Sequence, residues 1–359
     1  MAPPHTGNPD TVDTYGWYGQ YHGHPIRPCE IVERRLREDK KKVVFFAGDS
    51  SLDNKFWFQD SAPAVNGYET ILVPPEMKQD VAYHVNKLFA DRAPGWAQGR
   101  TRERNSQLQR LLSRPFSTRW AALNTAIEAT SLNDRAFGRL LDQDAFLRDH
   151  VTEEDVVVVS VGGNDIALAP VLCTCANIVP LLCAGLCCGE ALDACACACP
   201  PDVYTPCAGL TDCGCLGCGL PGCVAGLCSF PLGLGYFVDL FKNRVTAYAS
   251  NLVAKRKPKL VVVAMIYYLD VHGRGSWADG TLRLLGYNAK PELLQRAIRH
   301  VFKLGTRRIH IDGVPVVALP FFEILDGSDT ADYVERVEPS PRGGAKLAAA
   351  IVEAVLTNA

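Results

Sequence analysis

Short apolar runs recur along this chain and alternate with segments of helical periodicity. The runs predict strands at 43–48, Trp120–Ala126, Asp155–Val161, Lys259–Ile266 and Gly313–Leu319. Uninterrupted β-branched runs such as Asp155–Val161 are typical of strands buried on both faces of a parallel sheet. The helical patterns cover Ile31–Lys42, Asp80–Asp91, Arg104–Leu112, Asp134–Asp149, Phe237–Lys255, Pro291–Leu304 and Gly343–Thr357. Because strand and helix alternate, we expect an α/β fold around a doubly wound parallel sheet.

Two segments stand outside this alternation. Residues 1–41 form an N-terminal arm whose aromatic and histidine side chains predict packing on the body, residues 42–359. The second segment, 166–234, is an apolar, Cys-rich insertion without Lys or Arg. It follows the third strand, so we expect a lid over the carboxyl edge of the sheet. Pro170 and Pro180 favour a buried or interfacial hairpin over a membrane-spanning helix.

The chain has 15 cysteines, and 14 of them lie between Cys173 and Cys228. Disulfides, reduced thiols in an apolar lid and a metal site are the three alternatives, and the crowded Cys-x-Cys spacing disfavours zinc. The N-terminus lacks the apolar core of a signal peptide, which predicts a cytoplasmic protein, whereas the cysteine density favours an oxidising compartment. The sequence leaves these alternatives open.

Composition narrows the class of partner. The formal net charge is −2, with 48% hydrophobic and 21% charged residues. A nucleic-acid binder would need a basic surplus to neutralise phosphates, so we expect no nucleic-acid partner. A small molecule or a lipid is the expected partner, with peripheral membrane contact through 166–234. The oligomeric state is not specified by the sequence.

Polar motifs follow two of the predicted strands. Gly48-Asp49-Ser50 ends the first strand, and Gly163-Asn164-Asp165 ends the third. Parallel sheets present their chemistry at the carboxyl ends of the strands, so Ser50 and Asn164 are expected at one edge. A fixed amide donor that faces a developing negative charge is worth about 3 kcal/mol. The pattern therefore places a serine hydroxyl and an amide donor at the carboxyl edge of the sheet.

These motifs resemble two sequence blocks of the SGNH (GDSL) hydrolases, and the resemblance covers about Lys42 to Asn358. It implies a three-layer α/β/α sandwich, no metal or organic cofactor, and Ser50 as the nucleophile. It also implies an oxyanion hole built from the N–H groups of Ser50 and Ala129 and the Asn164 amide. Ala129 replaces the Gly of the family's Asn-x-Gly-x-x-Gly block. Its neighbour Glu128 either opposes the developing charge or points away and pairs elsewhere.

The last block departs from the family, because Glu335 and Glu338 stand where Asp-x-x-His is expected. In one interpretation Glu338 is the general base, with its pKa raised by burial or by Glu335. In a second, a histidine comes from elsewhere in the chain, the candidates being His22, His24, His272 and His310. In a third, the site is inactive and Glu338 pairs with Arg336 or Arg342.

Asp49, Asp165 and Tyr267 are the predicted substrate-binding residues, and Asp53 and Asn54 are expected to hold the loop after Ser50. Together the residues predict an esterase or lipase-type hydrolase that cleaves a hydrophobic acyl ester through a Ser50 acyl-enzyme. A non-catalytic binding protein on the same fold is the first alternative. A carbohydrate O-acetyl esterase is the second, and the apolar insertion argues against it.

Overall fold

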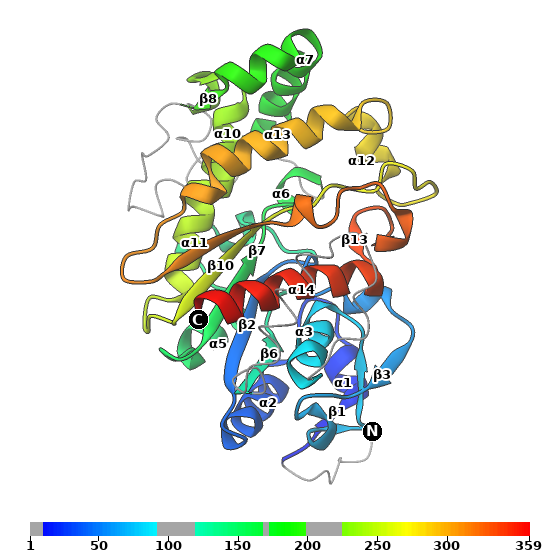
Figure 1. Cartoon of the computed structure of the whole chain (residues 1–359), viewed down its shortest axis with the longest axis vertical. Helices are drawn as coiled ribbons and strands as arrows, with labels where there is room; N and C mark the ends of the chain where they lie inside the picture. Colours follow the sequence, from blue (N-terminus) through cyan, green and yellow to red (C-terminus); the bar gives the residue numbers. More distant parts are fainter. Residues whose placement is uncertain (1–9, 92–118, 168–171, 199–224) are drawn as a thin grey trace.

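The computed structural model describes residues 10–91, 119–167, 172–198 and 225–359 (Figure 1). Its centre is a five-stranded sheet in the order β11-β10-β7-β2-β6, and all of its neighbouring strands are parallel. The strands are β2 (Lys42–Gly48), β6 (Trp120–Asn124), β7 (Val156–Ser160), β10 (Leu260–Met265) and β11 (Val316–Pro320). All five predicted strands are confirmed. The chain order reverses between β2 and β7, where open α/β sheets bind their ligands.

Helices flank both faces of the sheet. Val43 and Phe45 of β2 point into one core and Val44 and Phe46 into the other, and all four are fully buried. The second core is covered by α3 (Val81–Ala90) and α14 (Pro341–Asn358), which Figure 1 shows in front of the sheet. The first is covered by α2 (Ile26–Glu38), α5 (Asp142–His150), α10 (Leu234–Val238), α11 (Val245–Leu252) and α13 (Pro291–Leu304). This is the expected α/β architecture.

Three helix predictions need correction in their bounds. Helix α2 begins at Ile26 and ends at Glu38, earlier than the pattern Ile31–Lys42 predicts. The single helix predicted over Asp134–Asp149 is wrong, because the backbone of η4 (Asn133–Gly138) leaves the helical conformation at Phe137 (φ 59°) and residues 139–141 separate η4 from α5. The segment Phe237–Lys255 is divided among α10, the π-helical η6 (Asp239–Arg244) and α11. The helix predicted at Arg104–Leu112 lies outside the described residues.

The N-terminal arm packs on the body, as its composition predicts. Strand β1 (Val12–Asp13) pairs in parallel with β4 (Leu72–Val73), and α1 (Thr14–Tyr18) follows it. Trp17 is 2% exposed and its ring stacks on His24, with the ring centroids 3.8 Å apart.

The insertion begins after α6 (Asn164–Ala167) with α7 (Leu172–Cys195), a helix of 24 residues that packs on α13 and α10. A hairpin with its turn at Pro180 is therefore wrong, because Pro180 lies inside α7, whereas Pro170 lies outside the described residues. A short ladder joins β8 (Cys197–Ala198) to β9 (Ser229–Phe230). None of the helices among the described residues is long and apolar enough to cross a membrane.

The cysteine side chains that the structure describes, Cys29, Cys183, Cys195, Cys197 and Cys228, are free thiols. The other cysteines lie outside the described side chains, so the alternatives for the cluster stay as predictions. The remaining short elements are η1 (Lys55–Trp57), β3 (Ser61–Pro63), η2 (Tyr68–Thr70), β5 (Glu76–Lys78), α12 (Asp279–Leu284), η7 (Thr306–Arg308), η8 (Phe321–Glu323), η9 (Thr330–Asp332), β12 (Tyr333–Val334) and β13 (Glu338–Pro339).

Candidate active site

The turn that carries Ser50 is fixed by a glycine between two strands. Gly48 has φ 130°, and a Cβ at this position would lie 1.7 Å from the Ser160 carbonyl oxygen. The next residue, Asp49, donates its N–H to the same oxygen at 3.0 Å. Glycine is therefore required where β2 meets the end of β7. Ser50 follows at the carboxyl end of β2 and is 9% exposed.

Ser50 and Glu338 meet although four of the five strands of the central sheet, β6, β7, β10 and β11, lie between them in sequence. The Ser50 hydroxyl donates to Glu338 Oε1 at 2.8 Å. Glu338 begins β13, and contacts on either side hold this strand. The Tyr267 hydroxyl donates to the Val337 carbonyl at 2.7 Å, and Asn54 Nδ2 donates to the Pro339 carbonyl at 2.5 Å. These two contacts hold the backbone on either side of Glu338 and so position its carboxylate.

Burial dominates the electrostatics of Glu338, which is 7% exposed. Loss of hydration raises the pKa of this carboxyl to about 8, and the charges of Asp49 and Glu128 act in the same direction. The hydrogen bond from Ser50 lowers the pKa by a smaller amount. Oε2 has no hydrogen-bond partner among the described residues. A carboxylate with a pKa in this range can act as a general base near neutral pH.

The expected oxyanion donors lie on the loop after β6 and on α6. Ala129 adopts the left-handed conformation, with φ 56°, which supplies the backbone geometry that a glycine would otherwise provide. Asn164 Nδ2 donates to the Thr130 carbonyl at 2.8 Å. An amide nitrogen carries two N–H donors, so one remains for an oxyanion. The Thr130 hydroxyl also lies 3.4 Å from the Gly48 carbonyl, which joins this loop to the turn before Ser50.

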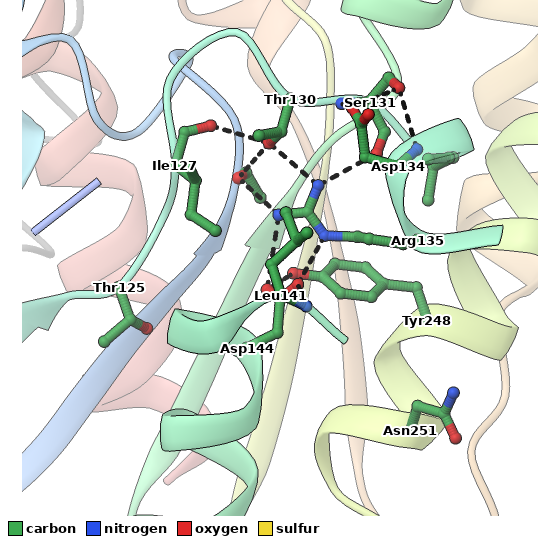
Figure 2. A network of polar contacts seen from close by, with 12 residues as sticks. Thr125, Ile127, Thr130, Ser131, Asp134, Arg135, Leu141, Asp144, Tyr248 and Asn251 are labelled. Carbon is green, nitrogen blue, oxygen red and sulfur yellow. Dashed lines mark hydrogen bonds and ion pairs between the residues drawn. The ribbon is translucent and has the colours of Figure 1, made fainter. Parts of the chain in front are cut away.

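Arg135 joins these two loops, and no motif in the sequence points to it (Figure 2). Its guanidinium donates to the Gly48 carbonyl at 3.2 Å, to Thr130 Oγ1 at 2.9 Å and to the Ser131 carbonyl at 3.0 Å. Asp144 of α5 accepts from Nε at 2.8 Å and compensates the buried charge. Arg135 therefore holds the turn before Ser50 against the loop that carries Ala129 and Thr130, which we call the oxyanion loop after its expected role.

Glu128 points away from the oxyanion position and pairs elsewhere, the second of the two alternatives left open by the sequence. Its Oε2 accepts the Gly23 N–H of the arm at 2.7 Å, and its Oε1 is bonded by Lys55 Nζ. Lys55 also donates to Asp53 at 2.6 Å, and both of these side chains are fully buried. This network joins the arm, the loop after Ser50 and the oxyanion loop.

The three predicted substrate-binding residues use their polar atoms within the protein. Asp49 accepts from the Ser51 N–H and hydroxyl, while Asp165 accepts the N–H groups of Leu132 and Asn133. Burial raises the pKa of Asp49 to about 6 and also raises that of Asp165. Tyr267 is 5% exposed and bonds to the backbone beside Glu338. The three residues therefore hold the backbone segments around Ser50, after Ala129 and before Glu338.

Glu335 lies apart from the Ser50–Glu338 pair. Its carboxylate accepts the Trp277 N–H at 3.2 Å, and the charges that raise the pKa of Glu338 come from Asp49 and Glu128 instead. If the site were inactive, Glu338 was expected to pair with Arg336 or Arg342, but both arginines pair with other groups. Arg336 donates to Asp279 at 2.7 Å, and Arg342 donates to Asp329 at 2.6 Å.

The four candidate histidines differ in position. His24 is buried against Trp17, His272 is exposed, and His310 pairs with Asp312 on the surface. His22 is exposed and its Nδ1 lies 3.1 Å from the Glu128 carbonyl, one residue before Ala129. Of the four, it is the one that contacts the oxyanion loop.

One group of described residues has the spacing of metal ligands, with atoms of His24, Asp53 and Asp80 within 4.8 Å of one another. Each has a partner inside the protein. His24 Nδ1 lies 2.8 Å from the Trp17 carbonyl, Asp53 pairs with Lys55, and Asp80 caps α3 through the Tyr83 N–H at 2.7 Å. We interpret the group as the anchor of the arm.

Comparison with models of protein families, with curated proteins and with solved structures gives no match to this chain.

Proposed function

We propose that this protein is a serine hydrolase of the SGNH type that cleaves carboxylic esters with Glu338 as its base. The observation that carries the proposal is the 2.8 Å hydrogen bond from the Ser50 hydroxyl to a buried carboxylate whose pKa is about 8. A serine hydroxyl is a weak nucleophile unless an adjacent base accepts its proton. The pairing of a strand-end serine with such a base meets this requirement.

In the proposed reaction Ser50 Oγ attacks the ester carbonyl carbon while its proton moves to Glu338 Oε1. The negative charge on the carbonyl oxygen is stabilised by the Asn164 amide and the N–H groups of Ser50 and Ala129. Protonated Glu338 then gives its proton to the departing alcohol, which leaves an acyl group on Ser50. Water then attacks the acyl carbonyl carbon while Glu338 accepts its proton, and this proton passes to Ser50 Oγ as the acid leaves, which restores the free enzyme.

The proposed substrate is an ester of a small molecule or a lipid with a hydrophobic acyl group. Exposed apolar side chains of the insertion support this class and the proposed membrane contact, namely Val179, Leu227, Phe230 and Leu232. An exposed apolar surface of this kind favours binding of the insertion to a membrane or lipid interface.

The test is labelling with a fluorophosphonate, followed by intact mass across pH. We expect one adduct on the wild-type protein, none on Ser50→Ala, and a loss of roughly 100-fold or more in rate for Glu338→Gln. Because Glu338 must be ionised to accept a proton, the wild-type rate should rise with pH through about 8. Glu335→Gln is the matched control and should keep the wild-type profile.

Labelling that survives Glu338→Gln would place the base elsewhere, and His22→Gln is then the variant to measure. Folded wild-type protein that takes no label at any pH would contradict the proposed function and favour a binding protein.

A further inference from the structure

Three aromatic rings form a corner at the surface, which we call the aromatic corner: Tyr21 of the arm, and Phe56 and Trp57 of η1. The Tyr21 and Phe56 ring centroids lie 5.0 Å apart with the planes at 64°, and those of Phe56 and Trp57 lie 5.3 Å apart at 85°. Tyr21 is 45% exposed and Phe56 54%. Folding normally buries rings of this size, so exposed rings in contact with one another indicate a binding surface.

The aromatic corner borders the proposed active site through Glu128. On one side, Tyr21 is followed by His22 and Gly23, which contact the Glu128 carbonyl and carboxylate respectively. On the other side, Phe56 follows Lys55, which pairs with the same carboxylate. Glu128 directly precedes Ala129, the proposed oxyanion residue, so the aromatic corner adjoins the loop that carries Ala129.

Acidic groups outnumber basic ones around this corner. Lys55 is shared between two carboxyl groups, those of Asp53 and Glu128, and the carboxyl group of Glu338 adds a further negative charge only above a pH of about 8. Their influence reaches the exposed ring, because burial and then the charges of Glu128 and Glu338 raise the pKa of the Tyr21 hydroxyl. The faces of aromatic rings are also negative, so both features attract a cation.

The ring geometry bears on the shape of the ligand. A sugar ring stacks on a flat aromatic platform, whereas these planes are turned by 64° and 85° relative to one another. Rings that face different directions suit a compact, nearly spherical group, such as a quaternary ammonium.

We propose that Tyr21, Phe56 and Trp57 form a subsite for an organic cation, a quaternary ammonium carried by the alcohol part of the ester substrate. This inference rests on the proposed function, because it assigns the cation to the substrate of that reaction. Binding of the cation itself does not require catalysis. The proposed acyl group and the cation then occupy opposite sides of the scissile ester bond.

The experiment is a calorimetric titration of Ser50→Ala protein with choline and with 3,3-dimethylbutan-1-ol, which has the same shape and no charge. We expect choline to bind about 3- to 30-fold more tightly than the neutral alcohol. Phe56→Ala and Tyr21→Ala should each weaken choline binding several-fold. Phe137→Ala removes another exposed ring, 60% exposed, and should leave choline binding unchanged.

Equal or tighter binding of the neutral alcohol would overturn the proposal in favour of an apolar subsite. Tighter binding of methyl glucoside would overturn it in favour of a sugar platform, and absence of saturable choline binding would also overturn it. Fluorophosphonate labelling of the wild type separates the two failures. Labelled protein that does not bind choline refutes the subsite alone, and unlabelled protein that binds choline refutes the hydrolase alone.

Discussion

Glu338 stands where the sequence resemblance led us to expect a histidine, and the chemistry of its carboxyl group depends on its surroundings. An exposed glutamate has a pKa of about 4.3 and is a weak base towards an alcohol. Here burial raises the pKa to about 8, with smaller contributions from Asp49 and Glu128. The structure thus raises the pKa of this carboxylate above that of an imidazole in water, which is about 6.5.

The raised pKa of Glu338 predicts a stability effect with a defined sign. The folded protein holds this proton more tightly than the unfolded chain, so stability is lost as pH rises from about 4.5 to about 8 and is then constant. Glu338→Gln keeps the side chain neutral and should not show this loss of stability, which in the wild type amounts to up to about 5 kcal/mol at pH 9 relative to pH 4.

The measurement is urea unfolding of the wild type and Glu338→Gln at several pH values. Glu335→Gln is the control, because its carboxylate is half-buried and lies apart from Ser50. A constant difference between the wild type and Glu338→Gln across pH would show that Glu338 titrates normally in the folded protein.

At the scale of elements, the contact between β2 and β7 decides whether the nucleophile turn forms. A Cβ on Gly48 would overlap the Ser160 carbonyl oxygen, which belongs to the backbone of a buried strand and cannot move aside. We expect Gly48→Ala to destabilise the fold by at least about 3 kcal/mol and to reduce labelling of Ser50.

Chemical denaturation measures this effect, with Gly280→Ala as the matched control. Gly280 lies in α12, where a Cβ meets nothing within 4 Å, so this variant should be neutral or slightly stabilising. Equal stabilities of the two variants would argue against the strand contact as the constraint.

At the scale of the whole molecule, the N-terminal arm is part of the site. Its Gly23 N–H and His22 contact Glu128, and Trp17 anchors the arm in the core. Trp17→Ala should cost about 3–5 kcal/mol locally and release the arm from Glu128. We expect faster proteolysis near the arm and slower labelling of Ser50.

Limited proteolysis and the labelling rate check this prediction, with circular dichroism to show that the sheet persists. Tyr15→Ala on the same helix is the control, since Tyr15 is 73% exposed. An arm that is cleaved rapidly while Ser50 labels at the wild-type rate would exclude the arm from the site.

The sequence by itself determined the strands and one side of the site. Apolar β-branched runs such as that of β7 are a local signal, because a strand buried on both faces needs apolar residues at every position. The helix α13 also agrees with its pattern, which begins at Pro291 and ends at Leu304. Ser50 and Asn164 were recognisable because each ends a strand in a polar motif.

Only the tertiary structure decided what surrounds Ser50. The proximity of Glu338 depends on how the sheet and α14 place β13, and its pKa depends on burial, which no local pattern encodes. The pairing of Glu128 with Lys55 and the arm, and the bonds from Arg135 to two loops, likewise join residues far apart in sequence. Local patterns specify elements, whereas charge balance and desolvation depend on the neighbours that folding brings together.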